Sequence, residues 1–384
     1  MSPSKGSPTE VGLRRLATPA VQSLAPYLPG KPIDELEREL GIRNVVKLAS
    51  NESPFGPSPK AIAAARTALA TIGQYPDGGG HELKTKLARL HGVSAEQLTL
   101  GNGSNDILVL VAEAFLTPDL EAVYSQYAFA VYPIAVHATG ATCRSVAALP
   151  AGAAMAYGHD LTAMRAAITE RTRLVFIANP NNPTGTYVEP QDLLRFIRSM
   201  PRSALVVLDE AYFEYARSIP LQNGIDWLDE CPNLVIVRTF AKAYGLAGLR
   251  IGYAVSHPEV ADMLNRIRQP FNVSSVALAA AAAALDDPEH VAHTVAVAIS
   301  ERVRVATVLR QRGLEVAPSA GNFLLVRIGP AAAACYQRLL RAGIIVRPVG
   351  NYGLPEHLRI TLGTIDENER LLAALTTVLA AGSL

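Results

Sequence analysis

A chain of 384 residues is too long to fold around one ordinary hydrophobic core, and its length fits two domains. Hydrophobic residues make up 49% and charged residues 18%, a balance that supports a large core and argues against global disorder. The net charge of +1, from 35 basic and 34 acidic side chains, argues against a nucleic-acid or acidic-membrane partner.

The three cysteines are widely spaced and follow no metal-ligand pattern, so we expect reduced thiols and no bound metal. The polar N-terminus lacks the apolar core of a signal peptide. The longest apolar run, residues 276–285, is too short to cross a bilayer. These features predict a cytoplasmic protein without membrane contact.

The first part of the chain is expected to be extended up to the first helix. Residues before about 13 are expected to form a flexible tail, and residues 25–32 a proline-punctuated arm. A short amphipathic helix is expected at 33–40. The patterns that follow indicate a strand and two helices: 45–49, 60–70 and 82–91.

From about residue 97 the chain alternates apolar strands with helical stretches. The expected strands are 98–100, 121–124, 141–146, 174–178, 204–208, 234–237 and 251–255. The expected helices are 106–115, 128–138, 161–168 and 191–200. This alternation predicts an α/β fold with a mainly parallel sheet and helices on both faces.

After residue 271 the pattern changes to an alanine-rich helix pair at 274–312 and then to a smaller α+β portion. The elements expected there are a strand, a helix and two strands: 322–328, 331–342, 344–347 and 357–362. We therefore expect three segments: a tail, arm and first helix at 1–46, a large domain at 47–275 and a small domain at 276–384. The arm is expected to pack with the small domain or with a partner subunit.

Reactive residue types gather in loops at strand ends, where ligands bind in parallel sheets. In residues 101–105, glycines precede a helix N-terminus, which suits a phosphate. A helix-capping turn with Ser104 or Asn105 as the cap explains the same residues. Residues 178–185 contain two prolines and three asparagines, typical of a turn but also able to aim an amide at a ligand.

Asp209 is the candidate for binding a cation, and Lys242 is the candidate for covalent chemistry. Asp209 ends an apolar run, where burial would raise its pKa unless a cation pairs with it. That cation is either a structural partner or a cofactor nitrogen. Lys242 is the only lysine after Lys86, and a lysine forms a Schiff base where an arginine cannot. Arg250 follows eight residues later and suits a phosphate. Together these signals predict a pyridoxal phosphate site.

Three motifs resemble the fold-type I pyridoxal-phosphate aminotransferases, in the class II group that includes the histidinol-phosphate aminotransferases. They are residues 239–252 around Lys242, residues 179–185 and residues 208–212. Residues 26–32, 49–57 and 358–364 resemble segments of the histidinol-phosphate branch. The resemblance runs from about residue 25 to the C-terminus, and it implies the fold-type I architecture.

The resemblance also implies roles for individual residues. Lys242 would form the Schiff base and move the proton, Asp209 would pair with the pyridine nitrogen, and Asn182 and Tyr212 would bind the phenolic oxygen. Tyr127 would stack on the ring. The phosphate would be held by Gly103, Ser104, Thr239, Arg250 and, from the neighbouring subunit of a homodimer with shared sites, Tyr75. The substrate would be bound by Arg359, with Arg347, Tyr27 and Asn51 as further candidates.

The activity implied is transamination of L-histidinol phosphate with 2-oxoglutarate in histidine biosynthesis. The alternatives are an aromatic amino-acid aminotransferase, a threonine-phosphate decarboxylase and a cofactor-free binding or regulatory relative. One residue departs from the family pattern, because Ala241 stands where a serine usually precedes the lysine. A hydroxyl contact to the phosphate is therefore expected to be missing.

Overall fold

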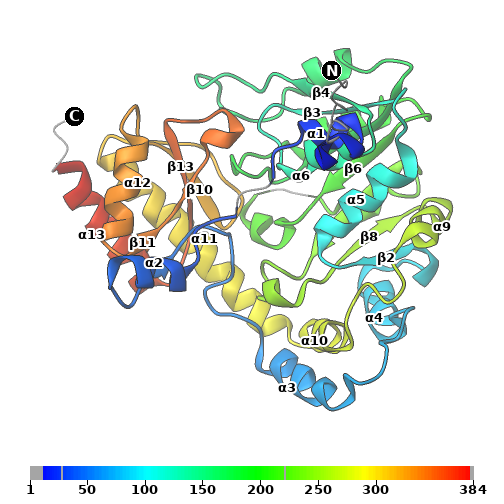
Figure 1. The fold of residues 1–384 in the computed structure, drawn as a ribbon, viewed down its shortest axis with the longest axis horizontal. Helices are drawn as coiled ribbons and strands as arrows, with labels where there is room; N and C mark the ends of the chain where they lie inside the picture. The colour runs from blue at the N-terminus through cyan, green and yellow to red at the C-terminus, as the bar shows by residue number, and fades with distance from the viewer. Residues whose placement is uncertain (1–11, 27–28, 220–221, 381–384) are drawn as a thin grey trace, which may run out of the picture.

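The computed structural model describes residues 12–26, 29–219 and 222–380. The larger part is built on a seven-stranded sheet. Figure 1 shows beside it a smaller part with α12, α13, β10 and β13, and α11 runs from the smaller part toward α10. The tail expected before residue 13 falls almost entirely on residues outside this description. No helix within the described ranges combines the length and the apolar run that a bilayer crossing requires.

The seven-stranded sheet has the strand order β2-β8-β7-β6-β5-β3-β4. Its strands in that order are β2 (Leu98–Gly101), β8 (Gly252–Ser256), β7 (Leu234–Thr239), β6 (Leu205–Asp209), β5 (Thr172–Ala178), β3 (Glu121–Ser125) and β4 (Thr142–Val146). β8 is antiparallel to both neighbours, and the other pairs are parallel. The predicted α/β fold with a mainly parallel sheet is confirmed, and the antiparallel β8 is an addition that the apolar pattern did not indicate.

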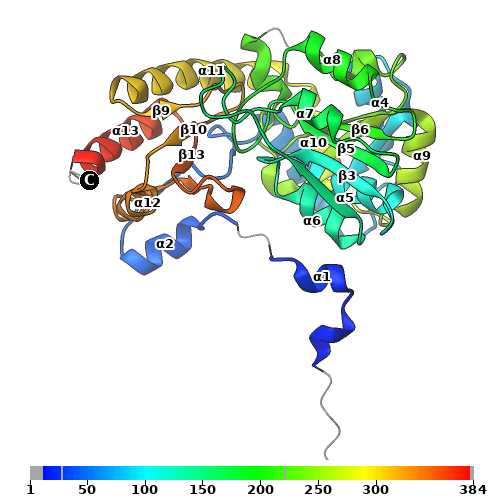
Figure 2. The ribbon, with the colours of Figure 1, turned by 90° about the horizontal axis from the view of Figure 1, so that it is seen from above.

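Helices cover both faces of this sheet, which explains why its central strands are almost continuously apolar. α5 (Ser104–Phe115), α6 (Val131–Ala138) and α9 (Pro258–Ile267) pack on one face. The other face is covered by α4 (His81–His91), α7 (Leu161–Ala166), α8 (Pro190–Arg198) and α10 (Ser275–Leu285). Figure 2 shows α7 and α8 on the side of β5 opposite to α5 and α6.

The smaller part is built on the antiparallel sheet β12-β13-β10-β9. The strands are β9 (Glu315–Val316), β10 (Phe323–Arg327), β12 (Arg347–Pro348) and β13 (His357–Thr361). Three helices share its core: α11 (Pro288–Gln311), α12 (Ala332–Arg341) and α13 (Ile365–Ala380). The predicted helix pair at 274–312 is confirmed as α10 and α11, which are separated at residues 286–287.

The remaining elements connect the N-terminal region to these two sheets. They are α1 (Pro19–Ser23), α2 (Ile33–Leu40), β1 (Val46–Lys47), α3 (Pro59–Ala68) and β11 (Ile344–Ile345). β1 pairs with β11 in parallel, so the single strand expected at 344–347 is wrong. It is two short strands, because β11 pairs with β1 whereas β12 pairs with β13.

Three helices were absent from the sequence expectations: α1, α9 and α13. All three carry helix-start signals, because α1 and α9 begin with a proline and α13 has Asp366 and Glu367 in its first turn.

The loop after β7 carries Lys242 and packs backbone to backbone on residues 53–57. Gly245 has a φ of +70°, and a Cβ added there would lie 2.1 Å from the carbonyl oxygen of Gly56. Only glycine fits this position, because the left-handed backbone and the close contact both exclude a side chain. The contact fixes the loop that holds the lysine.

We predict that Gly245→Ala destabilises the protein by about 1–3 kcal/mol, through backbone strain and the clash with Gly56. Urea denaturation would measure the change. Gly248→Ala is the matched control, because a Cβ there meets no atom within 4 Å. Equal stability of the two variants would contradict the proposed contact.

Candidate active site

A cavity of about 430 Å³ lies at the carboxyl ends of β5, β6 and β7. Residues predicted from four separate loops meet in its lining: Ser104, Asn182, Asp209, Tyr212, Thr239, Lys242 and Arg250. The loops converge because neighbouring parallel strands end at the same edge of the sheet. The cavity is therefore the candidate active site.

Lys242 presents a buried amine to this cavity. Its Nζ donates a hydrogen bond to the carbonyl oxygen of Ser50 at 3.1 Å. Burial lowers the pKa of Lys242 to about 8, and the positive charge of Arg359 adds to the effect. A lysine with such a pKa readily loses its proton near neutral pH, which is the condition for attack on a carbonyl.

Asp209 is buried at the end of β6 and is 5% exposed. Its Oδ1 accepts a hydrogen bond from the Ala211 amide at 3.1 Å, and its Oδ2 accepts one from the Tyr132 hydroxyl at 2.8 Å. Burial raises the pKa of Asp209 to about 6, and the hydrogen bond from Tyr132 acts in the opposite direction. Among the described residues no cationic side chain forms an ion pair with this carboxylate, so a structural partner does not account for it. The site fits a cationic nitrogen on a ligand.

Tyr132, which donates a hydrogen bond to Asp209, was not among the residues predicted from the sequence. It lies on α6, inside the stretch expected as the helix 128–138, and nothing in that pattern separated it from an ordinary core residue. The usable signal is that a buried tyrosine hydroxyl has to find a hydrogen-bond partner. The identity of that partner depends on tertiary structure.

One end of the cavity suits an anion. Gly103 has a φ of +81°, and a Cβ there would lie 2.4 Å from the guanidinium of Arg250. A Cβ on Gly252 would lie 2.4 Å from the Ser104 amide, at the start of the twelve-residue helix α5. The hydroxyl of Thr239 is close by and accepts from the Ala241 amide at 3.1 Å. Helix amides, a guanidinium and a hydroxyl thus face one small region, a combination suited to phosphate.

A second group of polar residues joins the two sheets beside this cavity. Arg359 on β13 donates to Oδ1 of Asn182 at 2.6 Å and to the carbonyl oxygen of Ala49 at 2.5 Å. The side-chain Nδ2 of Asn51 donates a hydrogen bond to the Tyr212 hydroxyl at 2.8 Å. The predicted residues therefore form two hydrogen-bonded pairs, Arg359 with Asn182 and Asn51 with Tyr212.

Tyr127, Tyr75 and Arg347 are among the described residues of the predicted site that do not line the cavity. Tyr127 packs in a cluster with Tyr157 and Tyr352, and its ring lies 5.8 Å from that of Tyr157. Tyr75 is 83% exposed and stacks on Phe271, with 4.7 Å between the ring centroids. Arg347 is buried near Gly30, and Tyr27 lies outside the described residues. The roles expected for these four stay predictions.

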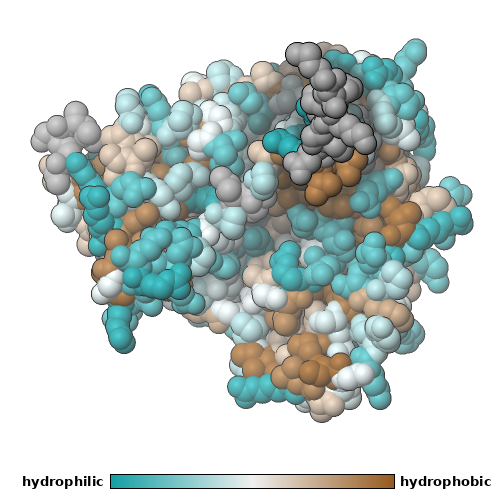
Figure 3. All heavy atoms as spheres, viewed as in Figure 1, coloured by the Kyte–Doolittle hydropathy of each residue, from teal (hydrophilic) through white to brown (hydrophobic). Residues whose placement is uncertain are grey.

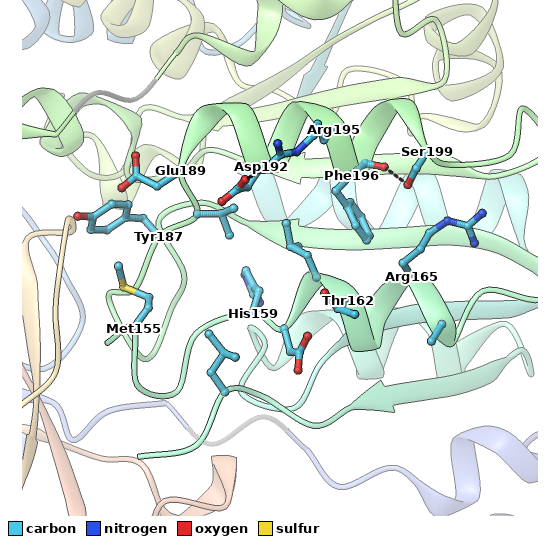
Figure 4. Close-up of a pocket in the computed structure, with 15 residues that line it drawn as sticks. Met155, His159, Thr162, Arg165, Tyr187, Glu189, Asp192, Arg195, Phe196 and Ser199 are labelled. Carbon is cyan, nitrogen blue, oxygen red and sulfur yellow. Dashed lines mark hydrogen bonds and ion pairs between the residues drawn. The ribbon is translucent and has the colours of Figure 1, made fainter. Parts of the chain in front are cut away.

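A larger cavity of about 860 Å³ lies between α7 and α8 (Figure 4). None of the predicted site residues lines it, and its lining lacks a lysine. Its buried His159 donates from Nε2 to the carbonyl oxygen of Ala178 at 2.8 Å. Ala178 lines the candidate active site, so this hydrogen bond joins the linings of the two cavities. The chemistry of the lining, and not the volume, identifies the smaller cavity as the active site.

We predict that Lys242→Met stabilises the cofactor-free protein at pH 7. Burial lowers the pKa of Lys242 from its ordinary value near 10.5 to about 8, so below pH 8 folding buries a charged lysine. This effect costs at most roughly 3 kcal/mol, and it fades as the pH rises from 8 to 10.5. Urea denaturation at pH 7 and pH 10 should show a stability difference that narrows at pH 10. The exposed Lys60→Met variant should show no such trend, and a pH-independent difference for Lys242→Met would contradict the burial argument.

Comparisons with known proteins agree with this geometry. The model of the family "Aminotransferase class I and II" matches residues 43–375. The chain is 56% identical to histidinol-phosphate aminotransferase 2 of Pseudomonas fluorescens, over 95% of this chain and 98% of the relative. It is also 56% identical to histidinol-phosphate aminotransferase 2 of Pseudomonas aeruginosa, with the same two coverages.

The crystal structure of histidinol-phosphate aminotransferase from Sinorhizobium meliloti in complex with pyridoxal-5'-phosphate superposes with a TM-score of 0.86. The two proteins are 33% identical, and the match covers 95% of this chain and 97% of the other. The family match spans most of the sequence and includes the loops that build the cavity. The chain belongs to the class I and II aminotransferase family.

Proposed function

We propose that this protein is a pyridoxal-phosphate-dependent aminotransferase that converts L-histidinol phosphate and 2-oxoglutarate to imidazole acetol phosphate and L-glutamate in histidine biosynthesis. The observation that carries the proposal is one cavity in which Lys242, Asp209 and Arg250 meet. The names of relatives that are 56% identical over nearly their whole length support the substrate.

The residues of the cavity fit pyridoxal phosphate along its length. Asp209 would hold the ring nitrogen, and Asn182 and Tyr212 would bind the phenolic oxygen. The amides at Gly103 and Ser104, the Thr239 hydroxyl and Arg250 would hold the phosphate. When bound, the cofactor acts as an electron sink for the substrate carbon that loses its proton.

Lys242 is the proposed proton carrier of the reaction. Its surroundings lower the pKa of the amine to about 8, so the amine would accept a proton from the substrate Cα and release it again during the reaction. The amine donates a hydrogen bond to the carbonyl oxygen of Ser50 from a partly buried side chain, which keeps it in place.

Arg359 would bind the amino donor and the 2-oxo acid acceptor in turn. Histidinol phosphate carries a phosphate and 2-oxoglutarate carries carboxylates, and a guanidinium binds either group with two parallel hydrogen bonds. Arg347 is a second buried arginine on the neighbouring strand, paired in register with Arg359. Two arginines side by side suit a doubly charged phosphate, whereas Asn51 and Tyr27 stay candidates for the rest of the substrate.

We also propose a cytoplasmic homodimer with shared active sites. Apolar side chains near Tyr75 are exposed in the single chain: Leu69 is 53% exposed, Ile72 63% and Phe271 45%. Figure 3 shows apolar surface where α3 lies in Figure 1. A surface of this kind favours burial against a second copy, and it would place Tyr75 within reach of the partner's phosphate site.

An aromatic amino-acid aminotransferase is the second candidate. One side of the cavity is lined by apolar residues of α5 and of the β3–α6 region: Val109, Phe129, Val131 and Ile134. Such a lining also suits an aromatic side chain that lacks a phosphate.

We predict that kcat/KM for histidinol phosphate exceeds that for phenylalanine or tyrosine by about tenfold or more, because only the phosphate offers a charge to the arginines. Steady-state assays with 2-oxoglutarate would measure the ranking. Lys242→Ala should abolish turnover of all three donors. A higher kcat/KM for phenylalanine would overturn the substrate assignment in favour of the aromatic enzyme.

We predict that Ala241→Ser tightens pyridoxal phosphate binding by about three- to tenfold, because it adds a hydroxyl beside the phosphate site. Titration of the cofactor-free protein by fluorescence would give the dissociation constant. Pyridoxal without the phosphate is the control ligand, and its affinity should stay unchanged. An equal gain for both ligands would show that the serine acts elsewhere.

A further inference from the structure

Asp209 has to be ionised to hold a cationic ring nitrogen, and its burial opposes this. The groups that face it are Tyr132 from α6, Lys242 from the loop after β7, and Glu210 and Tyr212 from its own segment. Its partner on β5 is the apolar Ala178. Lys242 favours the ionised carboxylate and the neighbouring Glu210 disfavours it. The hydrogen bonds to the carboxylate therefore carry much of the stabilisation.

Tyr132 supplies the side-chain hydrogen bond to this carboxylate. Its ring is fully buried and stacks on Phe176 of β5, with 4.8 Å between the centroids and 15° between the planes. Phe129 lies edge-on against the same ring at 6.0 Å. The two contacts fix the ring, so the hydroxyl reaches Oδ2 of Asp209 at 2.8 Å without further ordering.

The direction of this hydrogen bond is set by chemistry. Burial and the Asp209 charge hold the pKa of Tyr132 well above its usual value, so the phenol stays protonated and donates. The Ala211 amide donates to Oδ1, so each carboxylate oxygen receives one donor. A carboxylate has about four lone-pair sites, and the remaining ones stay available for a ligand N–H.

We infer that Tyr132 is a positioning residue, which keeps the Asp209 carboxylate ionised and oriented for the cationic nitrogen of the cofactor ring. The inference rests on the proposed function and adds to it a residue that lies outside the three family motifs. Tyr132 touches neither the cavity nor the substrate, because it is absent from the cavity lining and acts through Asp209.

The test compares Tyr132→Phe with the wild type in binding of two ligands to the cofactor-free protein. One ligand is pyridoxal phosphate, and the other is 1-deazapyridoxal phosphate, in which carbon replaces the ring nitrogen. Tyr132→Phe should raise the dissociation constant of pyridoxal phosphate about tenfold, because a hydrogen bond to a charged group is lost. The deaza ligand cannot pair with Asp209, so its dissociation constant should change less than about twofold on the same reasoning.

Tyr124→Phe is the matched control. Tyr124 is a buried tyrosine on β3 of the same sheet, with its hydroxyl near Cys143 and not near Asp209. The variant should leave both dissociation constants unchanged. If Tyr132→Phe weakens both ligands equally, the tyrosine has only a packing role, and if it weakens neither, the hydroxyl does not hold the carboxylate. Either result overturns the inference.

A second measurement needs no cofactor. An aspartate with a raised pKa in the fold loses stability as the pH rises from its unfolded value through about 6, because the buried group then ionises. Without the Tyr132 hydroxyl this loss should grow, so Tyr132→Phe should be more destabilising at pH 7.5 than at pH 5. The Asp209→Asn background should remove that pH dependence, and Tyr124→Phe should show none.

These readouts separate the two proposals. Failure of the wild type to bind pyridoxal phosphate would refute the proposed function, whereas the pH dependence of stability would still test the Tyr132–Asp209 hydrogen bond. Cofactor binding and transamination by the wild type, together with a pH-independent effect of Tyr132→Phe, would refute only the positioning role.

Discussion

Three neighbouring parallel strands end within two residues of one another, and the candidate site depends on this register. Ala178 of β5 pairs with Asp209 of β6, and Asp209 pairs with Val237 of β7. The loops that follow these strands therefore start side by side and deliver Asn182, Tyr212 and Lys242 to one cavity. A shift of one residue in any pair would also reverse the facing of every side chain in that strand.

The same burial that creates the cavity acts on its two charged residues in opposite directions. It lowers the pKa of Lys242 to about 8 and raises that of Asp209 to about 6, so both move toward neutrality. A neutral amine serves Schiff-base chemistry, whereas a neutral carboxyl would not hold a cation. The site therefore needs hydrogen-bond donors at Asp209 to keep the carboxylate ionised. The Ala211 amide and the Tyr132 hydroxyl are two such donors.

Local patterns in the sequence were sufficient for the strands of the large sheet and for singling out Lys242, Asp209 and Asn182, because each follows an apolar run at a strand end. Arg250 was singled out by its distance of eight residues from Lys242. The antiparallel β8 escaped prediction, since an apolar strand has the same pattern in either direction. Tyr132 escaped because its partner is 77 residues away in sequence. The position of Tyr75 relative to a phosphate depends on a second chain, so a single chain does not test it.

Arg359 gives the site a mechanical property. In the described chain it joins the four-stranded sheet to the seven-stranded sheet through Asn182, and it also reaches the carbonyl of Ala49. A ligand that binds both Arg359 and Asn182 would replace their direct hydrogen bond, and the two sheets would then be connected through the ligand. Occupancy of the cavity then becomes a cross-link between the two parts of the molecule. The stiffness of the protein between its two sheets should accordingly follow the charge and length of whatever the cavity holds.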